Sequence, residues 1–186
     1  TKKDNNIFYN GLIDYTLKNT RQWLNETDQL RTDSLLALAK PVFEKFKNRK
    51  GRQTYNFWRT DTAFYYPYIG LVNLIMKKAD LPDDMDDTVL SLLALDADDR
   101  TAKEVHALMQ QYINSDTVSL RTVIESYENY PAYSTWFGKK FPVVFDVSVL
   151  CNILSFVQHY KLVWTKADSA SLDLIIETIQ KDYHRD

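Results

Sequence analysis

The sequence predicts one all-α domain over residues 1–186, with its helices arranged in two layers. Apolar residues recur at steps of three and four along nearly the whole chain, which is the period of an amphipathic helix. The 186 residues include only 4 glycines and 5 prolines, too few for the many tight turns of a β-sandwich. Two segments, 89–95 and 143–157, are apolar on nearly every side. Such helices have to be enclosed by two-faced ones, so we expect an inner and an outer layer.

The first half of the chain is expected to hold three helices, over about residues 7–25, 33–48 and 66–79. Pro41 lies inside the second of these. Because proline has no amide hydrogen and clashes with the preceding turn, we expect a kink or a break just before it. Residues 49–65 are basic at first and then rich in aromatic residues, and they form the clearest connector.

The second half is expected to contain four helices, over about residues 83–95, 101–114, 142–160 and 168–183. Thr101 and Glu104 have the spacing of a capping box, and Pro142 suits the first position of a helix. Residues 115–140 carry a mixed pattern. This pattern fits a short helix or strand over 118–127, followed by an ordered aromatic loop.

Charge, hydropathy and cysteine content exclude several classes of function. The formal net charge is −2 and no basic residues gather on one face, so nucleic acid is not an expected partner. No stretch approaches the ~20 apolar residues of a transmembrane helix. The single cysteine, Cys151, excludes an internal disulfide, and its apolar surroundings predict a buried, inert thiol. We expect a soluble protein, either cytoplasmic or exported after removal of a signal.

Four carboxylates gather within five residues directly ahead of the apolar run 89–95: Asp83, Asp84, Asp86 and Asp87. Acids at the start of a helix can cap free N–H groups and complement the helix dipole. That role needs only one or two acids. Crowded carboxylates can also hold a proton that they would normally lose, because like charges repel and burial disfavours the charged form.

A third interpretation of the acidic cluster is a divalent-ion site. Asp83, Asp84 and Asp87 fit the pattern D-D-x-x-D and fall on neighbouring positions of one helix face. This pattern resembles the segment with which class I prenyl-diphosphate enzymes bind magnesium and a diphosphate. Hard cations prefer such oxygen ligands. A second acidic motif normally faces the first, and Asp146 is the one candidate for it.

The run Asp84-Met85-Asp86-Asp87-Thr88 resembles the D-x-D-D-T segment of class II terpenoid cyclases such as squalene-hopene cyclase. It is also similar to a segment of uncharacterised bacterial proteins with the same α/α-toroid design. Residues 145–154 resemble an inner helix of those proteins, and residues 55–58 resemble their aromatic entry segment. The resemblance implies a double ring of helices around a hydrophobic cavity. In this shorter chain, which lacks the glutamine-tryptophan repeats of the cyclases, we expect an incomplete ring.

For the site, the resemblance implies that Asp86 protonates an alkene or an epoxide without a metal, with Asp84 and Asp87 as its flanking acids. Asp146 and Asn152 interrupt the apolar segment 143–157. They either cap the helix and bond to a backbone group, or they line the same cavity as Asp86.

The aromatic residues around Trp58 and Tyr68 form either core packing or the wall of a pocket for an apolar ligand. The first functional expectation is a toroid-like protein that binds an apolar small molecule or a protein partner in its concave centre, without a cofactor. The alternative is an isoprenoid-processing enzyme with Asp86 as general acid. A second alternative is magnesium-dependent binding of a prenyl diphosphate through Asp83, Asp84 and Asp87.

Overall fold

The computed structural model describes residues 5–62, 81–114, 127, 130–138 and 141–181. This part of the chain contains six α-helices, two short 3₁₀-helices and no β-strand, so the predicted all-α fold is confirmed. The helix expected over residues 66–79 lies outside the described residues. In chain order the elements are α1 (Phe8–Thr20), η1 (Arg21–Trp23), α2 (Glu26–Phe43), α4 (Met85–Ala94), α5 (Asp99–Met109), η2 (Gln110–Tyr112), α6 (Val147–His159) and α7 (Lys166–Gln180).

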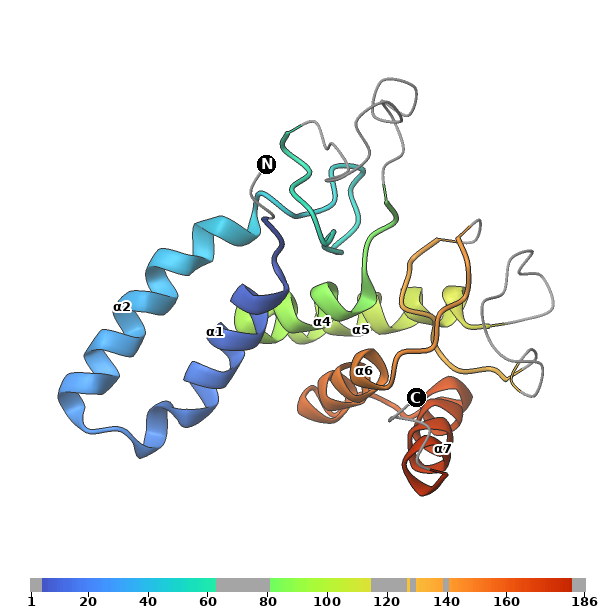
Figure 1. Cartoon of the computed structure of the whole chain (residues 1–186). Helices are drawn as coiled ribbons and strands as arrows, with labels where there is room; N and C mark the ends of the chain where they lie inside the picture. Colours follow the sequence, from blue (N-terminus) through green and yellow to red (C-terminus); the bar gives the residue numbers. More distant parts are fainter. Residues whose placement is uncertain (1–4, 63–80, 115–126, 128–129, 139–140, 182–186) are drawn as a thin grey trace.

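Helix α4 lies at the centre of the fold (Figure 1). It packs against α1 on one side and against α6 on another, and α6 packs in turn against α7. Every residue from Met85 to Leu93 is buried. The prediction of an enclosed inner helix is therefore confirmed for this segment. The double ring that the resemblance implies stays a prediction.

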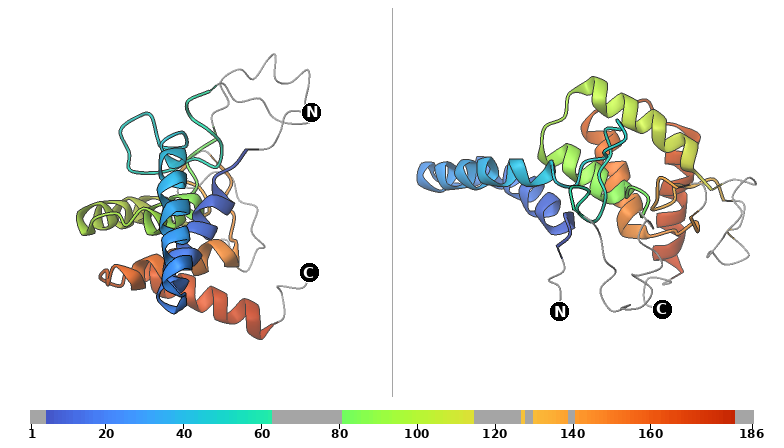
Figure 2. Two further views of the ribbon diagram at one scale, coloured as in Figure 1. Left: turned by 90° about the vertical axis from the view of Figure 1, so that its left-hand side faces the viewer. Right: turned by 90° about the horizontal axis from the view of Figure 1, so that it is seen from above.

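Helix α1 joins α4 to the projecting helix α2. Gly11 of α1 faces α4 so closely that a Cβ atom there would lie 3.0 Å from the Cβ atom of Leu90. Near the other end of α1, the Lys18 ammonium donates hydrogen bonds to the carbonyl oxygens of Leu93 (2.9 Å) and Ala94 (3.0 Å). These carbonyls belong to the last turn of α4, where a cation is favourable. Helix α2 starts at the far end of α1 and runs back beside it to Phe43, which is buried in the core, so that α1 and α2 project together from the other helices (Figures 1 and 2).

Two expected helix boundaries are wrong, and local capping explains both. Helix α6 begins at Val147 rather than at Pro142, because the Asp146 side chain accepts a hydrogen bond of 2.8 Å from the Ser148 amide. Helix α2 begins at Glu26 and continues through Pro41 to Phe43, without the expected break. Pro41 stands in the last turn of α2, where little helix follows it.

The start of the fifth expected helix also differs. Helix α5 begins at Asp99, since the carboxylate of Asp98 caps it by accepting a hydrogen bond of 2.9 Å from the Thr101 amide. The last helix starts at Lys166, where Thr165 and Asp168 form a capping box. Cys151 is exposed on α6, contrary to the buried thiol that we expected, because the face of α6 that carries it is open to solvent. No helix in the described parts of the chain is both long and apolar enough to cross a membrane.

Candidate functional site

Three segments of the chain meet at the start of α4. The backbone of Asp84 pairs with Tyr55 on one side and with Trp136 on the other. The Asp84 amide donates to the Tyr55 carbonyl at 3.0 Å, and the Met85 amide donates to the Thr135 carbonyl at 2.8 Å. Irregular segments from before and after α4 therefore enclose the acidic run, and its carboxylates become buried even though they start a helix.

Asp83 and Thr88 mark the two ends of the acidic run, and both are held by neighbouring segments. The Asp83 carboxylate accepts hydrogen bonds from the Asn48 side-chain amide (2.6 Å) and the Thr54 hydroxyl (2.5 Å). The Thr88 hydroxyl donates to the Asp84 carbonyl at 2.6 Å and accepts from the Tyr55 amide at 2.9 Å. Both residues thus fix the position of the run.

Asp84 is the N-cap of α4. Its carboxylate accepts hydrogen bonds from the backbone amides of Asp86 (2.7 Å) and Asp87 (3.2 Å). The capping role predicted for the cluster is therefore present in this one residue. Burial, and after it the negative charge of Asp86, raises the pKa of Asp84 to about 7, although the two amides lower it.

Asp86 faces helix α6. Its Oδ1 atom accepts a hydrogen bond of 2.7 Å from the side-chain amide of Asn152, and 7% of the residue is exposed. Burial raises the pKa of Asp86 to about 6, with Asn152 opposing the shift and the charge of Asp146 adding to it. The structure thus places Asn152 against Asp86, whereas Asp146 caps α6, which was the alternative expected for it. A cavity shared by the three residues stays a prediction.

Asp87 is the most enclosed acid of the cluster. Only 1% of the residue is exposed, and neither carboxylate oxygen has a hydrogen-bond partner among the described residues. Burial, followed by the charges of Asp84 and Asp86, raises the pKa of Asp87 to about 9. The hydroxyl oxygen of Ser91, one helical turn further on, is also buried and has no partner within the described part of the chain. Buried polar groups in this state require an explanation beyond capping.

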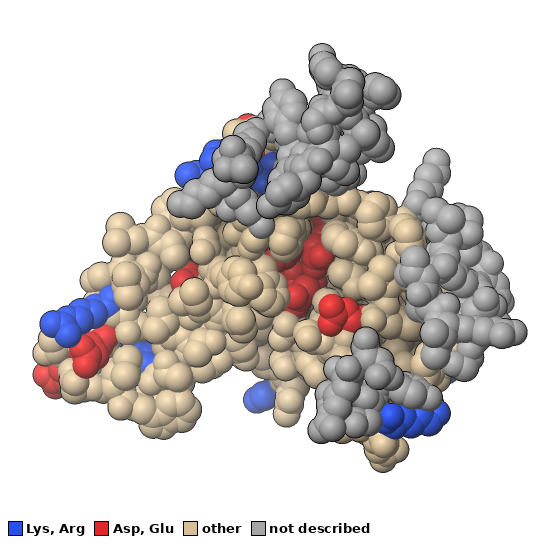
Figure 3. Space-filling model, in the orientation of Figure 1, with Lys and Arg blue, Asp and Glu red and all other residues tan. Residues whose placement is uncertain are grey.

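Positive charge does not compensate this cluster within the described residues. None of the ion pairs between described side chains includes Asp83, Asp84, Asp86 or Asp87. Figure 3 shows acidic atoms gathered near the centre of one face of the molecule. Among the described residues, proton retention rather than ion pairing is the physical response available to these carboxyl groups.

The described part of the chain contains no preformed metal-binding site. No group of three or more histidine, cysteine, aspartate or glutamate side chains there is arranged to hold a metal ion. The carboxylate of Asp83 bonds to Asn48 and Thr54, whereas that of Asp84 caps its own helix. Magnesium binding through Asp83, Asp84 and Asp87 stays a prediction.

Of the two aromatic candidates, the structure describes Trp58 and not Tyr68. Trp58 is half-buried and pairs through its backbone with Asn6, and Tyr68 is not among the described residues. Tyr55 instead pairs with Asp84 of the acidic run, and the Asn56 side-chain amide donates to the Leu81 carbonyl, just ahead of the run, at 2.8 Å. Their position in a connector gave no sign of this role.

A second buried polar cluster supports the segment that covers the acids. His106 Nε2 lies 3.1 Å from Asp168 Oδ2, and the Tyr133 hydroxyl donates to Asp168 Oδ1 at 2.9 Å. Tyr133 is two residues from Thr135, which bonds to the start of α4. The cluster joins α5, α7 and residues 130–138, and no local spacing in the sequence indicates it.

No family model, no curated protein and no solved structure matches this chain.

Proposed function

We propose that this protein is a general-acid catalyst that protonates an apolar, isoprenoid-type alkene or epoxide through Asp86. One observation carries the proposal: four carboxyl groups at the start of α4 are between 1% and 8% exposed, and the most enclosed of them, Asp87, has no hydrogen-bond partner in the part of the chain that the structure describes. A helix start alone does not need such an arrangement. Strongly perturbed acids of this kind cluster at catalytic sites.

The division of labour within the cluster follows from exposure and pKa. A general acid works best when its pKa is near the working pH, and the pKa of Asp86 is raised to about 6. Asp86 is also more exposed than Asp87, at 7% against 1%. Asn152 occupies Oδ1 of Asp86, which leaves Oδ2 as the oxygen that carries the proton. Asp87, with a pKa raised to about 9, keeps a proton within the cluster at neutral pH.

The chemical step consists of one proton transfer. The O–H bond of Asp86 breaks, and the proton forms a new C–H bond with the π electrons of an alkene, or a new O–H bond with the oxygen of an epoxide as its C–O bond opens. The Asp86 carboxylate that remains lies opposite the developing carbocation and stabilises it. Loss of a proton from the carbocation to the cluster restores the acid.

The substrate class rests on the resemblance of residues 84–88 to the D-x-D-D-T segment of class II terpenoid cyclases. In that resemblance the middle acid is the proton donor, which is also the acid that faces α6 in this protein. Asp86 is also only 7% exposed, and a carbocation survives only where water has little access. Both points support an apolar substrate without a metal.

A binding function without catalysis is the second candidate. Asp83, Asp84 and Thr88 each hold a neighbouring backbone or side chain in place, as residues of a scaffold do. In this interpretation the concave side binds an apolar small molecule or a protein partner, and the acidic run is retained for its structural contacts. The two candidates differ in whether Asp86 transfers a proton.

Hydrogen isotope incorporation tests the proposal directly. The protein is incubated in D₂O with an isoprenoid alkene and with its terminal epoxide, and the deuterium content of recovered substrate and product is measured by mass spectrometry. We expect deuterium at carbon in the alkene products of the wild type and ring-opened or cyclised products from the epoxide. Asp86→Asn should abolish both, whereas Asp98→Asn, which alters an exposed helix cap, should not. Equal turnover by Asp86→Asn would exclude Asp86 as the proton donor.

A further inference from the structure

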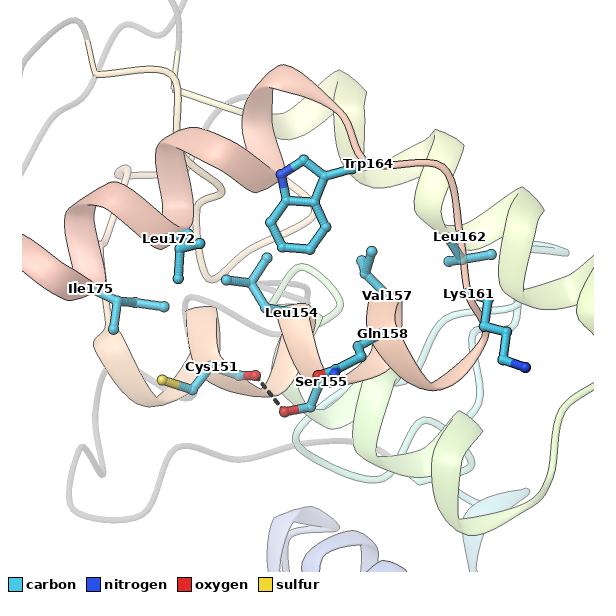
Figure 4. Close-up of a pocket in the computed structure, with 10 residues that line it drawn as sticks. All are labelled: Cys151, Leu154, Ser155, Val157, Gln158, Lys161, Leu162, Trp164, Leu172 and Ile175. Atoms are coloured by element: carbon cyan, nitrogen blue, oxygen red, sulfur yellow. Dashed lines mark hydrogen bonds between the residues drawn. The ribbon is translucent and has the colours of Figure 1, made fainter.

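A second candidate site lies between α6 and α7, on a different side of α6 from the acids. Asn152 of α6 points to Asp86, whereas the neighbouring Cys151 lines a groove with a volume of about 640 Å³ (Figure 4). This volume is within the range of about 300–1,000 Å³ that is typical of ligand pockets. The groove extends along α6 from Cys151 and ends at the linker to α7, where Lys161 lies.

The floor and the rim of the groove differ in character. Leu154, Val157 and Ile175 form an apolar floor and are 9%, 1% and 7% exposed. Trp164 and Leu172 stand at the rim, with exposed fractions of 45% and 40%. Exposed large apolar side chains around an apolar hollow indicate a surface that is covered by a ligand or a partner.

The indole of Trp164 is held in place, since its N–H donates a hydrogen bond of 2.8 Å to the Ser169 hydroxyl. Figure 4 shows the indole ring above Leu154. A rim side chain fixed in this way forms a preformed wall, and a ligand that packs against it needs little rearrangement.

Charge distinguishes the two ends of the groove. Lys161 is the single charged residue in the lining, and within the described residues its ammonium group forms no ion pair. At the other end, burial and the negative charge of Asp146 raise the pKa of the Cys151 thiol. The groove is therefore positive at the Lys161 end, apolar along its length, and unfavourable for an anion at the Cys151 end.

We propose that this groove binds a single-chain anionic amphiphile, such as a long-chain carboxylate. The hydrocarbon chain lies on Leu154, Val157 and Ile175, with its end toward Cys151, and the carboxylate pairs with Lys161. In this orientation the hydrocarbon chain covers the apolar floor of the groove, and the carboxylate gives the Lys161 ammonium group an ion-pair partner. The site is independent of the acidic cluster, so its test and the test of proton transfer can succeed or fail separately.

Cys151 offers a direct test because it is the only cysteine of the chain and lines the groove. The rate at which the uncharged reagent N-ethylmaleimide modifies Cys151 is measured with dodecanoate and with 1-dodecanol, both below their aggregation concentrations. We expect dodecanoate to slow modification several-fold. Dodecanol should require up to about fivefold higher concentration for the same protection, the contribution of one solvent-exposed ion pair.

Matched variants assign the effect to the groove. Lys161→Gln should remove the difference between the two probes, whereas Lys166→Gln, which removes an exposed charge outside the groove, should preserve it. Leu172→Arg should reduce protection by both probes. Circular dichroism of each variant verifies that it is folded.

Three results would overturn the proposal. Dodecanoate without any effect on Cys151 would show that the groove does not bind a hydrocarbon chain. If dodecanoate protects the wild type and Lys161→Gln equally, Lys161 does not pair with the carboxylate, and the ligand need not be an anion. If Cys151 is modified more slowly as the protein concentration rises, without any added probe, the groove is a contact with a second copy of the chain.

Discussion

Asp86 is the residue on which the proposed chemistry depends, and its burial predicts a measurable effect on stability. Its pKa is raised to about 6 in the folded protein, against about 3.9 in an unfolded chain. The folded state thus binds more protons between these values, and stability falls as the pH rises through them. Asp86→Asn removes this penalty. We expect the variant to be more stable by about 1–3 kcal/mol at pH 8.

Denaturant unfolding of the wild type and Asp86→Asn at pH 8 and pH 4 measures this effect. The gain should shrink at the lower pH, where the wild-type carboxyl is mostly protonated in the fold. A loss of stability at pH 8 would show that Asp86 serves the structure in its ionised form, and the general-acid proposal would lose its physical basis.

Substitution of Asn152 should change stability in the opposite direction to Asp86→Asn. Its amide donates to Asp86 and lowers the pKa of that carboxyl. Asn152→Leu keeps a similar volume but removes the donor, so the pKa of Asp86 should rise further, and the protein should lose about 1–3 kcal/mol at pH 8.

Carbon-13 NMR titration of the aspartate carboxyl groups measures the shift at Asp86 directly. The conservative variant Asn152→Gln, which retains an amide, provides the comparison. An unchanged titration of Asp86 in Asn152→Leu would mean that the hydrogen bond between α4 and α6 does not control its protonation.

The individual roles of the acids could be predicted only in part. The four adjacent carboxylates in the sequence indicated both capping and proton retention, and Asp84 and Asp87 show these two states side by side. The sequence could not show which acid caps the helix and which retains a proton, because this depends on neighbours that are distant in the chain. Asp83 is held by Asn48 and Thr54, which lie at the end of the helix expected over residues 33–48 and in the connector expected over residues 49–65.

At the scale of helices, the close approach of α1 to α4 at Gly11 predicts that a larger side chain there would disturb the packing. Gly11 of α1 faces Leu90 of α4, and an added Cβ atom would lie 3.0 Å from the Leu90 Cβ atom and 3.5 Å from its backbone carbon. Gly11→Val should therefore overpack the interface and destabilise the protein by about 1–3 kcal/mol. Thermal unfolding checks this prediction.

The control for this variant is Asn19→Val, which places the same β-branched residue at an exposed position of α1. It should change stability by less than about 0.5 kcal/mol. If both variants lose the same amount, the helix propensity of valine explains the effect, and close packing at Gly11 does not.

Apolar periodicity predicted the existence of the helices better than their ends. The run from Val89 to Leu93 indicated an enclosed helix and is enclosed. The start of α6 was placed too early because Pro142 suits a first helical position, whereas the side chain of Asp146 caps the helix in the structure. Proline and cap signals compete over a few residues, and tertiary contacts decide between them.

At the scale of the whole molecule, long-range polar contacts hold the site together. His106 and Asp168 lie 62 positions apart in the sequence, yet together with Tyr133 they anchor the segment that covers the start of α4. A sequence pattern shows only residues that share one element, so this cluster could not be predicted. It also contributes to the pH dependence of the fold.

The two buried clusters respond to pH in opposite directions. Burial alone would raise the pKa of Asp168, but hydrogen bonds from His106, Thr165 and Tyr133 outweigh it and lower the pKa. The stability from these bonds is present above the unfolded value of about 3.9 and is lost as the pH falls further. The pKa values of Asp86, Asp84 and Asp87 are instead raised, to about 6, 7 and 9, so their ionisation removes stability as the pH rises.

Together these shifts predict that the protein is most stable at about pH 4–5 and loses stability steadily up to about pH 9. Denaturant unfolding at pH 3, 5, 7 and 9 traces the curve. The double variant Asp86→Asn/Asp87→Asn should flatten its alkaline side and leave the acid side, which depends on Asp168, unchanged. Constant stability from pH 5 to pH 9 in the wild type would mean that the acids of α4 ionise freely in the fold. In that case the cluster could not hold the proton that the proposed reaction transfers.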